Sequence, residues 1–210
     1  GPISRFLKTA SPQRMIKSIP PSRPSKKVEM PTSGLVVSAF GAVPSVVRIS
    51  PVTDRWPYIQ AAVSMGNALI LLPSASDVRI VVNRLRRMGV HVGDYSKDWA
   101  AGLSGGTVVG NRSAAFATVK DLSAILMIDE HDESFQEEAS PTWHCREVVL
   151  ERAKRHSLPC VFTSPIPTPE VRYQTRLINE EKAEEVQGWS SVEVIDLRED
   201  DSAMGGLWPR

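Results

Sequence analysis

Cysteine is scarce in this sequence. Cys145 and Cys160 are the only two among 210 residues, and they do not form a Cys-x-x-Cys pair. A disulfide framework or a structural zinc cluster needs more cysteines at closer spacing, so neither can be assembled within this chain. Low cysteine content is typical of a protein that works in a reducing, intracellular compartment.

Long apolar runs are also missing. The longest hydrophobic stretches have the length of a strand, whereas a membrane-spanning helix needs about 20 apolar residues. No signal-peptide pattern opens the chain. We therefore expect a cytoplasmic protein with no membrane partner. The chain begins with Gly-Pro instead of Met, which indicates either a piece of a longer gene product or a scar of protease cleavage.

Acidic residues are rare in the first 34 positions, where Glu29 is the only one. The same segment carries a set of basic residues and prolines: Arg5, Lys8, Arg14, Lys17, Arg23, Lys26, Lys27, Pro2, Pro12, Pro20, Pro21, Pro24 and Pro31. Proline removes backbone donors, so the segment should not hold a stable helix beyond its first residues. We interpret residues 1–34 as a basic, Pro- and Ser-rich arm, either a solvated linker or a contact for nucleic-acid phosphates.

Beyond position 34, short β-branched runs alternate with amphipathic stretches. The expected strands are 35–39, 46–49, 68–72, 91–93, 107–109, 124–128, 160–163 and 192–197, and the expected helices are 56–65, 77–88, 146–155 and 170–186. The helix at 77–88 has the clearest pattern, because Ser76 can cap it, an apolar stripe runs along it and Gly89 ends it. Buried strands that alternate with such helices predict an α/β protein with a doubly wound, mostly parallel sheet.

One predicted strand, Ala124–Ile128, is followed directly by acidic residues at its carboxyl end, where sheets of this kind bind ligands. A buried strand followed by Asp-Glu is the Walker B arrangement of nucleotide hydrolases. In a working site, Asp129 would hold Mg²⁺ through its water shell, and Glu130 would orient the attacking water. The alternative is that these acids simply end a buried strand in a solvated loop.

A phosphate cradle to accompany these acids is missing. The nearest match to G-x-x-x-x-G-K-[ST] begins at Gly105, but Asn111 replaces the lysine and Arg112 replaces the Mg²⁺-binding hydroxyl. Residues 107–109 also have the pattern of a strand, whereas the cradle needs an open loop whose amides point inward. We therefore reject this segment as a P-loop.

Four elements of the chain resemble motifs of the first helicase lobe in the PriA family of replication restart helicases. They are Gly110–Phe116 (GNRSAAF), Asp129–Phe135 (DEHDESF), Trp143–Glu147 (WHCRE) and Thr163–Pro167 (TSPIP), in the family's order and spacing. The matched core is about residues 66–198. The resemblance implies a RecA-like, P-loop-type helicase lobe over residues 35–198, followed by a linker at 199–210 toward a second lobe.

The chain departs from the motif with which family members hold nucleotide phosphates. Where they carry G-x-T-G-S-G-K-T, this chain places Thr53, Asp54 and Arg55 at the degenerate Walker A position. Asp54 adds negative charge where phosphates would lie, and Arg55 offsets it only in part. Pro51 removes an amide donor from the same loop.

Two further motifs are altered. The family's D-E-E-H signature is one residue short, which leaves Asp129, Glu130 and His131 as a vestigial Walker B, and G-S-A-T-P has become Thr163–Pro167. Three elements of one ATPase cycle are therefore changed together, as in the degenerate branch of the family that lacks the Walker motifs. The resemblance then implies no nucleotide or metal in this chain, with zinc expected only in other regions of the family's proteins.

DNA contacts are expected at Asn111, Arg112 and Ser113. These residues follow a strand at its carboxyl end, where a guanidinium and a hydroxyl can reach backbone phosphates. The resemblance also implies that this element faces the DNA strand. The alternative is a salt bridge from Arg112 to the acids at 129–132.

With the resemblance, the sequence predicts a replication restart lobe that binds branched or single-stranded DNA, at the nucleoid, together with other primosome or replication proteins. It is expected to lack ATP-driven unwinding. Two alternatives stay open. One is an active ATP-dependent 3′–5′ DNA helicase, which would bind ATP and Mg²⁺ in an unconventional cradle at residues 53–56. The other is a non-catalytic protein-interaction module.

Overall fold

The computed structural model describes residues 4, 7–8, 11 and 15–189. The expected strand 192–197 and the linker 199–210 lie outside the described residues. At the centre is a seven-stranded sheet in the order β3-β4-β2-β5-β8-β1-β9, with parallel pairing throughout. Its strands are β1 (Ser45–Arg48), β2 (Asn67–Leu71), β3 (Val92–Asp94), β4 (Thr107–Gly110), β5 (Leu122–Met127), β8 (Cys160–Ser164) and β9 (Arg176–Asn179).

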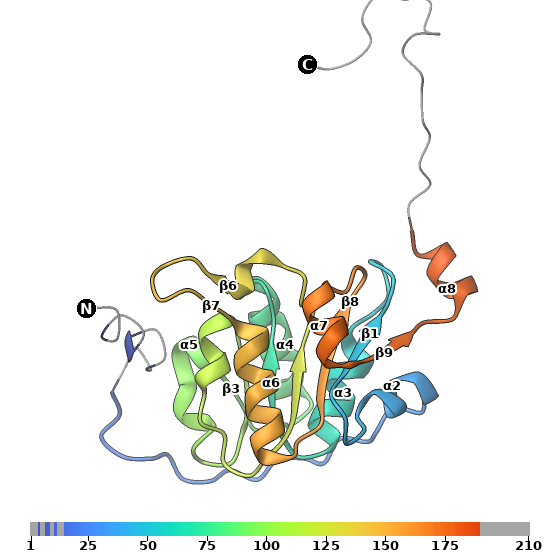
Figure 1. Ribbon diagram of the computed structural model, residues 1–210. Helices are drawn as coiled ribbons and strands as arrows, with labels where there is room; N and C mark the ends of the chain where they lie inside the picture. The colour runs from blue at the N-terminus through green and yellow to red at the C-terminus, as the bar shows by residue number, and fades with distance from the viewer. Residues whose placement is uncertain (1–3, 5–6, 9–10, 12–14, 190–210) are drawn as a thin grey trace, which may run out of the picture.

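Helices cover both faces of this sheet. One face carries α2 (Gly34–Ala39), α3 (Trp56–Ser64) and α4 (Ala75–Arg87), and the other carries α5 (Tyr95–Asp98), η2 (Arg112–Phe116), α6 (Cys145–His156) and α7 (Pro169–Gln174). In Figure 1, α6 lies in front of the strands, while α3 and α4 lie behind them. The predicted doubly wound α/β fold is therefore confirmed.

Smaller elements complete the described chain. They are η1 (Trp99–Ala101), η3 (Glu133–Phe135), the antiparallel pair β6 (Gln136–Glu137) and β7 (Trp143–His144), and α8 (Lys182–Gln187). None of the helices in the described segments combines the length and the apolar character needed to cross a bilayer.

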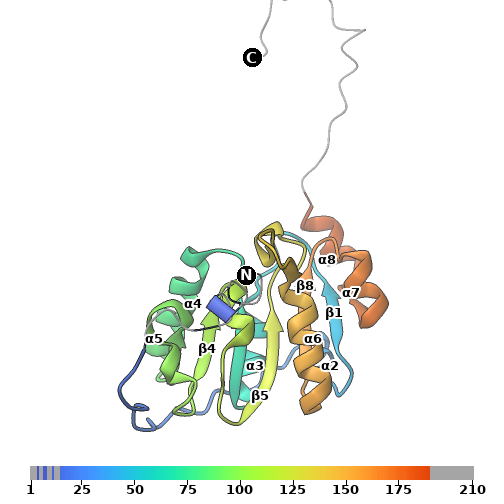
Figure 2. The ribbon, with the colours of Figure 1, turned by 60° about the vertical axis from the view of Figure 1, so that its left-hand side comes forward.

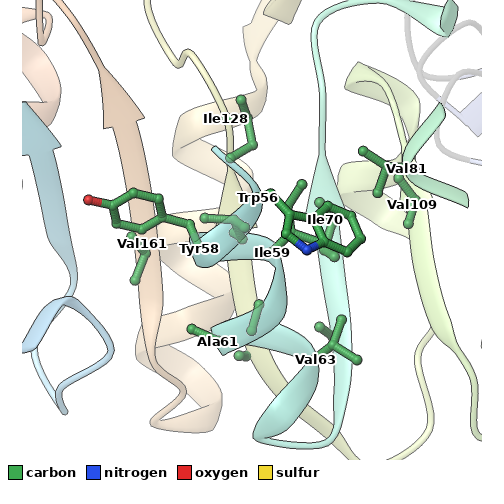
Figure 3. Close-up of a cluster of buried hydrophobic side chains, with 14 of the residues drawn as sticks. Trp56, Tyr58, Ile59, Ala61, Val63, Ile70, Val81, Val109, Ile128 and Val161 are labelled. Carbon is green, nitrogen blue, oxygen red and sulfur yellow. The ribbon is translucent and has the colours of Figure 1, made fainter. Parts of the chain in front are cut away.

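Helix α3 anchors the apolar core on its face of the sheet. Figure 3 shows Trp56, Ile59 and Val63 of this helix beside Ile70 of β2 and Val81 of α4. All five side chains are at most 8% exposed. Burial of such side chains contributes roughly 1.5–3 kcal/mol each, so this packing fixes the direction in which α3 leaves the loop that precedes it.

Two predicted elements differ from the structure. Residues 35–39 form helix α2 instead of a strand, because the buried positions are Val36 and Ala39, which lie on one face of a helix. The expected helix 170–186 is broken into α7, β9 and α8, since β9 pairs in parallel with the edge of β1. The local pattern missed this pairing because it joins segments that are distant in sequence.

Helix α4 begins two residues earlier than expected. Ser74, and not Ser76, is its N-cap, and the Ser74 Oγ accepts a hydrogen bond from the Asp77 amide at 3.1 Å. The predicted apolar stripe is buried, as expected, and includes Val78, Val82 and Leu85.

Part of the basic arm lies against the lobe. The Lys26 amide donates to the Gly89 carbonyl at 3.0 Å, and Ser25 Oγ accepts from the His91 amide at 3.1 Å. Val28 is 8% exposed and belongs to the same apolar cluster as α3. Figure 1 shows this segment, in blue, running along the lower edge of the sheet, and Figure 2 shows it near α4 and α5.

Candidate functional site

The loop after β1, residues 49–55, and the acids after β5 lie at the same edge of the sheet. Strand β8 separates β1 from β5, and the three strands are parallel, so their carboxyl ends meet at this edge. The loop leads directly into α3, and a strand–loop–helix turn of this kind is where P-loop proteins hold phosphates. The structure therefore brings the two predicted halves of the nucleotide site together.

Arg55 points at Asp129, the residue that would hold the metal in a working Walker B site. Its Nη2 lies 3.0 Å from Asp129 Oδ1, and its Nε donates to the same oxygen at 3.3 Å. The two side chains are 15% and 28% exposed, so water screens this ion pair less than it screens a surface pair. The carboxylate that would bind the water shell of Mg²⁺ is therefore already paired with a guanidinium group.

Asp129 itself has a left-handed backbone, with φ at +52°. This conformation costs roughly 1–2 kcal/mol in a residue other than glycine. Neighbouring hydrogen bonds hold it, because the Asp129 amide donates to Thr163 Oγ1 at 3.2 Å and the Glu130 amide donates to the Thr163 carbonyl at 3.0 Å. The end of β8 therefore sets the orientation of the acid.

The loop after β1 presents carbonyl oxygens, and not amides, to its centre. Arg55 Nη1 donates to the Ser50 carbonyl at 2.8 Å, to the Pro51 carbonyl at 3.2 Å and to the Thr53 carbonyl. A phosphate cradle has the opposite polarity, because its amides must point at the anion. The loop is built around a cation that belongs to the protein.

The donors of this loop are occupied by carboxylates of the same chain. Glu180, which follows β9, accepts from the Ser50 amide at 2.9 Å and from Thr53 Oγ1 at 2.9 Å. Asp54 accepts from the Trp56 amide at 2.9 Å, at the beginning of α3. Glu180 was not predicted as part of this site, because residues 170–186 were expected to form one helix.

Glu130 is fully buried and acts as a structural acceptor. Its Oε2 lies 3.0 Å from Arg146 Nη1, and the Thr168 hydroxyl donates to the same oxygen at 3.0 Å. The Thr168 amide donates to Oε1 at 2.8 Å. Both carboxylate oxygens are therefore engaged with α6 and with the start of α7, and the residue predicted to orient a water has 0% exposure.

The two histidines near this edge also make internal contacts. His131 Nδ1 lies 2.9 Å from Ser164 Oγ, which links the segment after β5 to the end of β8. His144 caps α6, since its Nδ1 accepts from the Arg146 amide at 3.1 Å. Burial, with a smaller contribution from Arg146, lowers the pKa of His144 to about 4, so the ring is neutral at pH 7 and can accept this hydrogen bond.

The predicted DNA contacts also bond to the protein itself. Asn111 Nδ2 donates to the Pro73 carbonyl at 3.1 Å. Arg112 forms a salt bridge with Glu137 at 3.1 Å, and it donates to the carbonyls of Ser134, at 3.2 Å, and Gln136. Ser113 lies in η2, directly after Arg112. Arg112 is thus paired with the acidic loop after β5, but with Glu137 and not with residues 129–132.

The residues at this edge do not fit a magnesium nucleotide. Asp129 is neutralised by Arg55, the loop carbonyls converge on the same guanidinium, and Glu180 holds donors that an anion would need. Within residues 15–189 and the few described positions before them, no group of three or more His, Cys, Asp or Glu side chains is placed to hold a metal ion.

Comparison with known proteins agrees with the resemblance found in the motifs. No family model matches the sequence. The chain is 33% identical over 115 residues to the replication restart protein PriA of Bacillus subtilis, which covers 49% of this chain and 14% of that protein. It is 27% identical over 154 residues to PriA of Thermotoga maritima, covering 65% of this chain and 20% of that protein. The matched part is thus a small fraction of each relative's length.

Solved structures agree on the fold. The Hef helicase domain of Pyrococcus furiosus matches with a TM-score of 0.51 at 13% identity, over 76% of this chain and 40% of that one. The sheet order and this match show the fold of the chain, which is a RecA-like parallel α/β domain. In sequence, part of the chain is similar to PriA proteins of several bacteria, and this similarity supports a PriA-like lobe.

Proposed function

We propose that this lobe serves a PriA-like replication restart protein that binds branched or single-stranded DNA and assists primosome assembly without hydrolysing ATP. The similarity to proteins named replication restart protein PriA supports the first part of the proposal. Its partners are then DNA and other primosome or replication proteins, in the cytoplasm at the nucleoid. Any zinc that the full protein holds would lie outside this chain.

The observation that carries the second part is the Arg55–Asp129 pair, 3.0 Å apart. For Mg²⁺ and a triphosphate to enter, Arg55 would have to leave both Asp129 and the loop carbonyls. Hydrogen bonds to charged groups contribute about 1.5–3 kcal/mol each. The cost of breaking these Arg55 hydrogen bonds would make nucleotide binding less favourable by the same amount.

A second obstacle is electrostatic. Glu180 and Asp54 place two carboxylates on the donors of the loop and of the α3 N-terminus. A triphosphate would have to displace these anions or lie beside them, and like charges at close range are unfavourable. The separate contacts of Glu130 with Arg146 and Thr168 leave that carboxylate fully buried, so it is not exposed to an attacking water.

Calorimetry and hydrolysis assays test the proposal on the full protein. We expect no saturable heat when ATP and Mg²⁺ are titrated in, no phosphate release stimulated by forked DNA, and no difference between wild type and Asp129→Asn. Salt-dependent binding of forked DNA is expected in parallel. DNA-stimulated hydrolysis that Asp129→Asn abolishes would establish the active helicase instead. Absence of DNA binding would favour a protein-interaction module.

A further inference from the structure

Arg112, which was predicted to contact DNA, forms its contacts within the lobe instead. Arg112 is paired with Glu137 at 3.1 Å and bonded to loop carbonyls, so its charge is largely used within the protein. A lobe that binds DNA therefore needs another source of positive charge. The described residues offer one on the outer face of α4.

Helix α4 presents a stripe of arginines to solvent. Arg79, Asn83, Arg86 and Arg87 are all exposed, and their spacing of i, i+4, i+7 and i+8 places them on one face of the helix. The opposite face is the apolar stripe that packs on the sheet. The burial of the other face therefore sets the orientation of Arg79 and Arg87, while Arg86 also contacts Val92 and Asp98.

Few acids neutralise this stripe. Arg86 lies 3.5 Å from Asp98, but these side chains are 48% and 53% exposed, and exposed pairs of this kind contribute little. Neither Arg79 nor Arg87 forms an ion pair with any residue in the described part of the chain. The guanidinium groups of Arg79 and Arg87 are therefore available for an external anion, whereas that of Arg86 also donates to the Val92 carbonyl at 3.4 Å and 3.3 Å.

The basic arm extends the stripe beyond the end of α4. The Lys26 amide bonds to the Gly89 carbonyl, two residues after Arg87, and the buried Val28 holds the segment in place. The side chains of Lys26 and Lys27 are exposed at this junction. Two segments that are distant in sequence thus form one positive surface, which we call the basic face: Arg79, Arg86, Arg87, Lys26 and Lys27.

We infer that the basic face binds the phosphate backbone of duplex DNA without reading its sequence. This inference rests on the proposed role of the lobe in DNA binding, and it assigns the surface that carries that role. The stripe from Arg79 to Arg87 is about 12 Å long, which matches roughly three phosphates along one strand. Guanidinium groups suit phosphate oxygens because they can donate two parallel hydrogen bonds.

Duplex DNA fits this face better than single-stranded DNA. Proteins that hold single strands combine basic side chains with exposed aromatic rings on which bases stack. The basic face carries no aromatic side chain, and nearby Trp56 is 8% exposed with the Arg84 guanidinium 3.7 Å above its ring. Contacts are then limited to phosphates, so affinity should depend on salt and not on base sequence.

The test is fluorescence anisotropy of the full protein with labelled 20-base-pair duplexes of two unrelated sequences, at several salt concentrations. Arg79→Gln combined with Arg87→Gln should weaken binding to both duplexes by roughly tenfold or more at 0.1 M salt. The slope of log affinity against log salt should decrease by about two. Lys26→Gln combined with Lys27→Gln tests the arm separately and should have an effect in the same direction.

The matched control is Lys154→Gln combined with Arg155→Gln, which removes the same charge from the exposed end of α6 on the other face of the sheet. In this control, the affinity should stay within twofold of wild type, and the slope of log affinity against log salt should stay within about 0.5 of wild type. An equal loss in this control would overturn the inference, because it would show an effect of net charge alone. The inference would also be overturned if the wild type binds DNA and the α4 variant binds it with the same affinity and salt slope. That result would leave the proposed function intact. Absence of binding to these duplexes by the wild type would overturn the inference, and absence of binding to forked and single-stranded DNA as well would overturn the proposed function.

Discussion

Removing Glu130 should destabilise the lobe far more than removing an acid from its surface. Glu130 is fully buried and accepts from Arg146 Nη1 at 3.0 Å, from the Thr168 amide at 2.8 Å and from the Thr168 hydroxyl at 3.0 Å. In Glu130→Leu, the Arg146 guanidinium would stay buried without its buried partner and would keep only the half-exposed Glu147, 3.5 Å from its Nε. Breaking a buried pair in this way costs about 3–5 kcal/mol.

Urea denaturation measures this cost. With a slope of about 2 kcal/mol per molar urea, a loss of about 4 kcal/mol lowers the midpoint by about 2 M. Such a loss is a large fraction of the roughly 5–15 kcal/mol by which native domains are stable. Combining Glu130→Leu with Arg146→Met should recover much of it, because an apolar pair of similar volume leaves no charge unpaired.

The control is Glu151→Gln, whose partner Arg155 lies 2.7 Å away on the surface of α6, with the two side chains 54% and 72% exposed. This change should alter stability by less than about 0.5 kcal/mol. A cost of less than about 1 kcal/mol for Glu130→Leu would contradict the structural role of this carboxylate. This role is also contradicted if the double variant loses the full sum of the two single losses, since the pair would then not be coupled.

Two further predictions concern helix caps. The His144 side chain takes up a proton near pH 6.5 in the unfolded state but only near pH 4 in the folded state, so its contribution to stability falls as the pH drops between these values. His144→Asn keeps an acceptor for the Arg146 amide but does not titrate. In urea denaturation, this variant should therefore lose about 1–2 kcal/mol less unfolding free energy than wild type between pH 7 and pH 4.5. Parallel pH profiles of the two proteins would contradict this. Ser74→Ala should cost about 1 kcal/mol because it removes the acceptor for the Asp77 amide, whereas Ser76→Ala should cost less than about 0.5 kcal/mol; equal thermal shifts would contradict the observed cap.

Local sequence patterns were sufficient for most of the sheet and for α4. Strands β2, β5 and β8 were predicted to within about two residues, because continuous apolar runs bounded by turns are a property of neighbouring residues. The order and spacing of the helicase motifs also identified the PriA-like character before any contact was known. The failures at 35–39 and 170–186 came where burial and strand pairing, and not local propensity, decided the element.

The contacts that fill the candidate nucleotide site became known only from the folded structure. The amino-acid sequence alone was enough to predict the fold class, the order of the motifs and the absence of a phosphate-binding lysine. It could not show that Arg55 reaches Asp129, 74 residues away, or that Glu180 returns to Ser50 across 130 residues. Those contacts depend on the order of β1, β8, β5 and β9 in the sheet, and strand order is a property of the folded chain, which no local spacing of residues encodes.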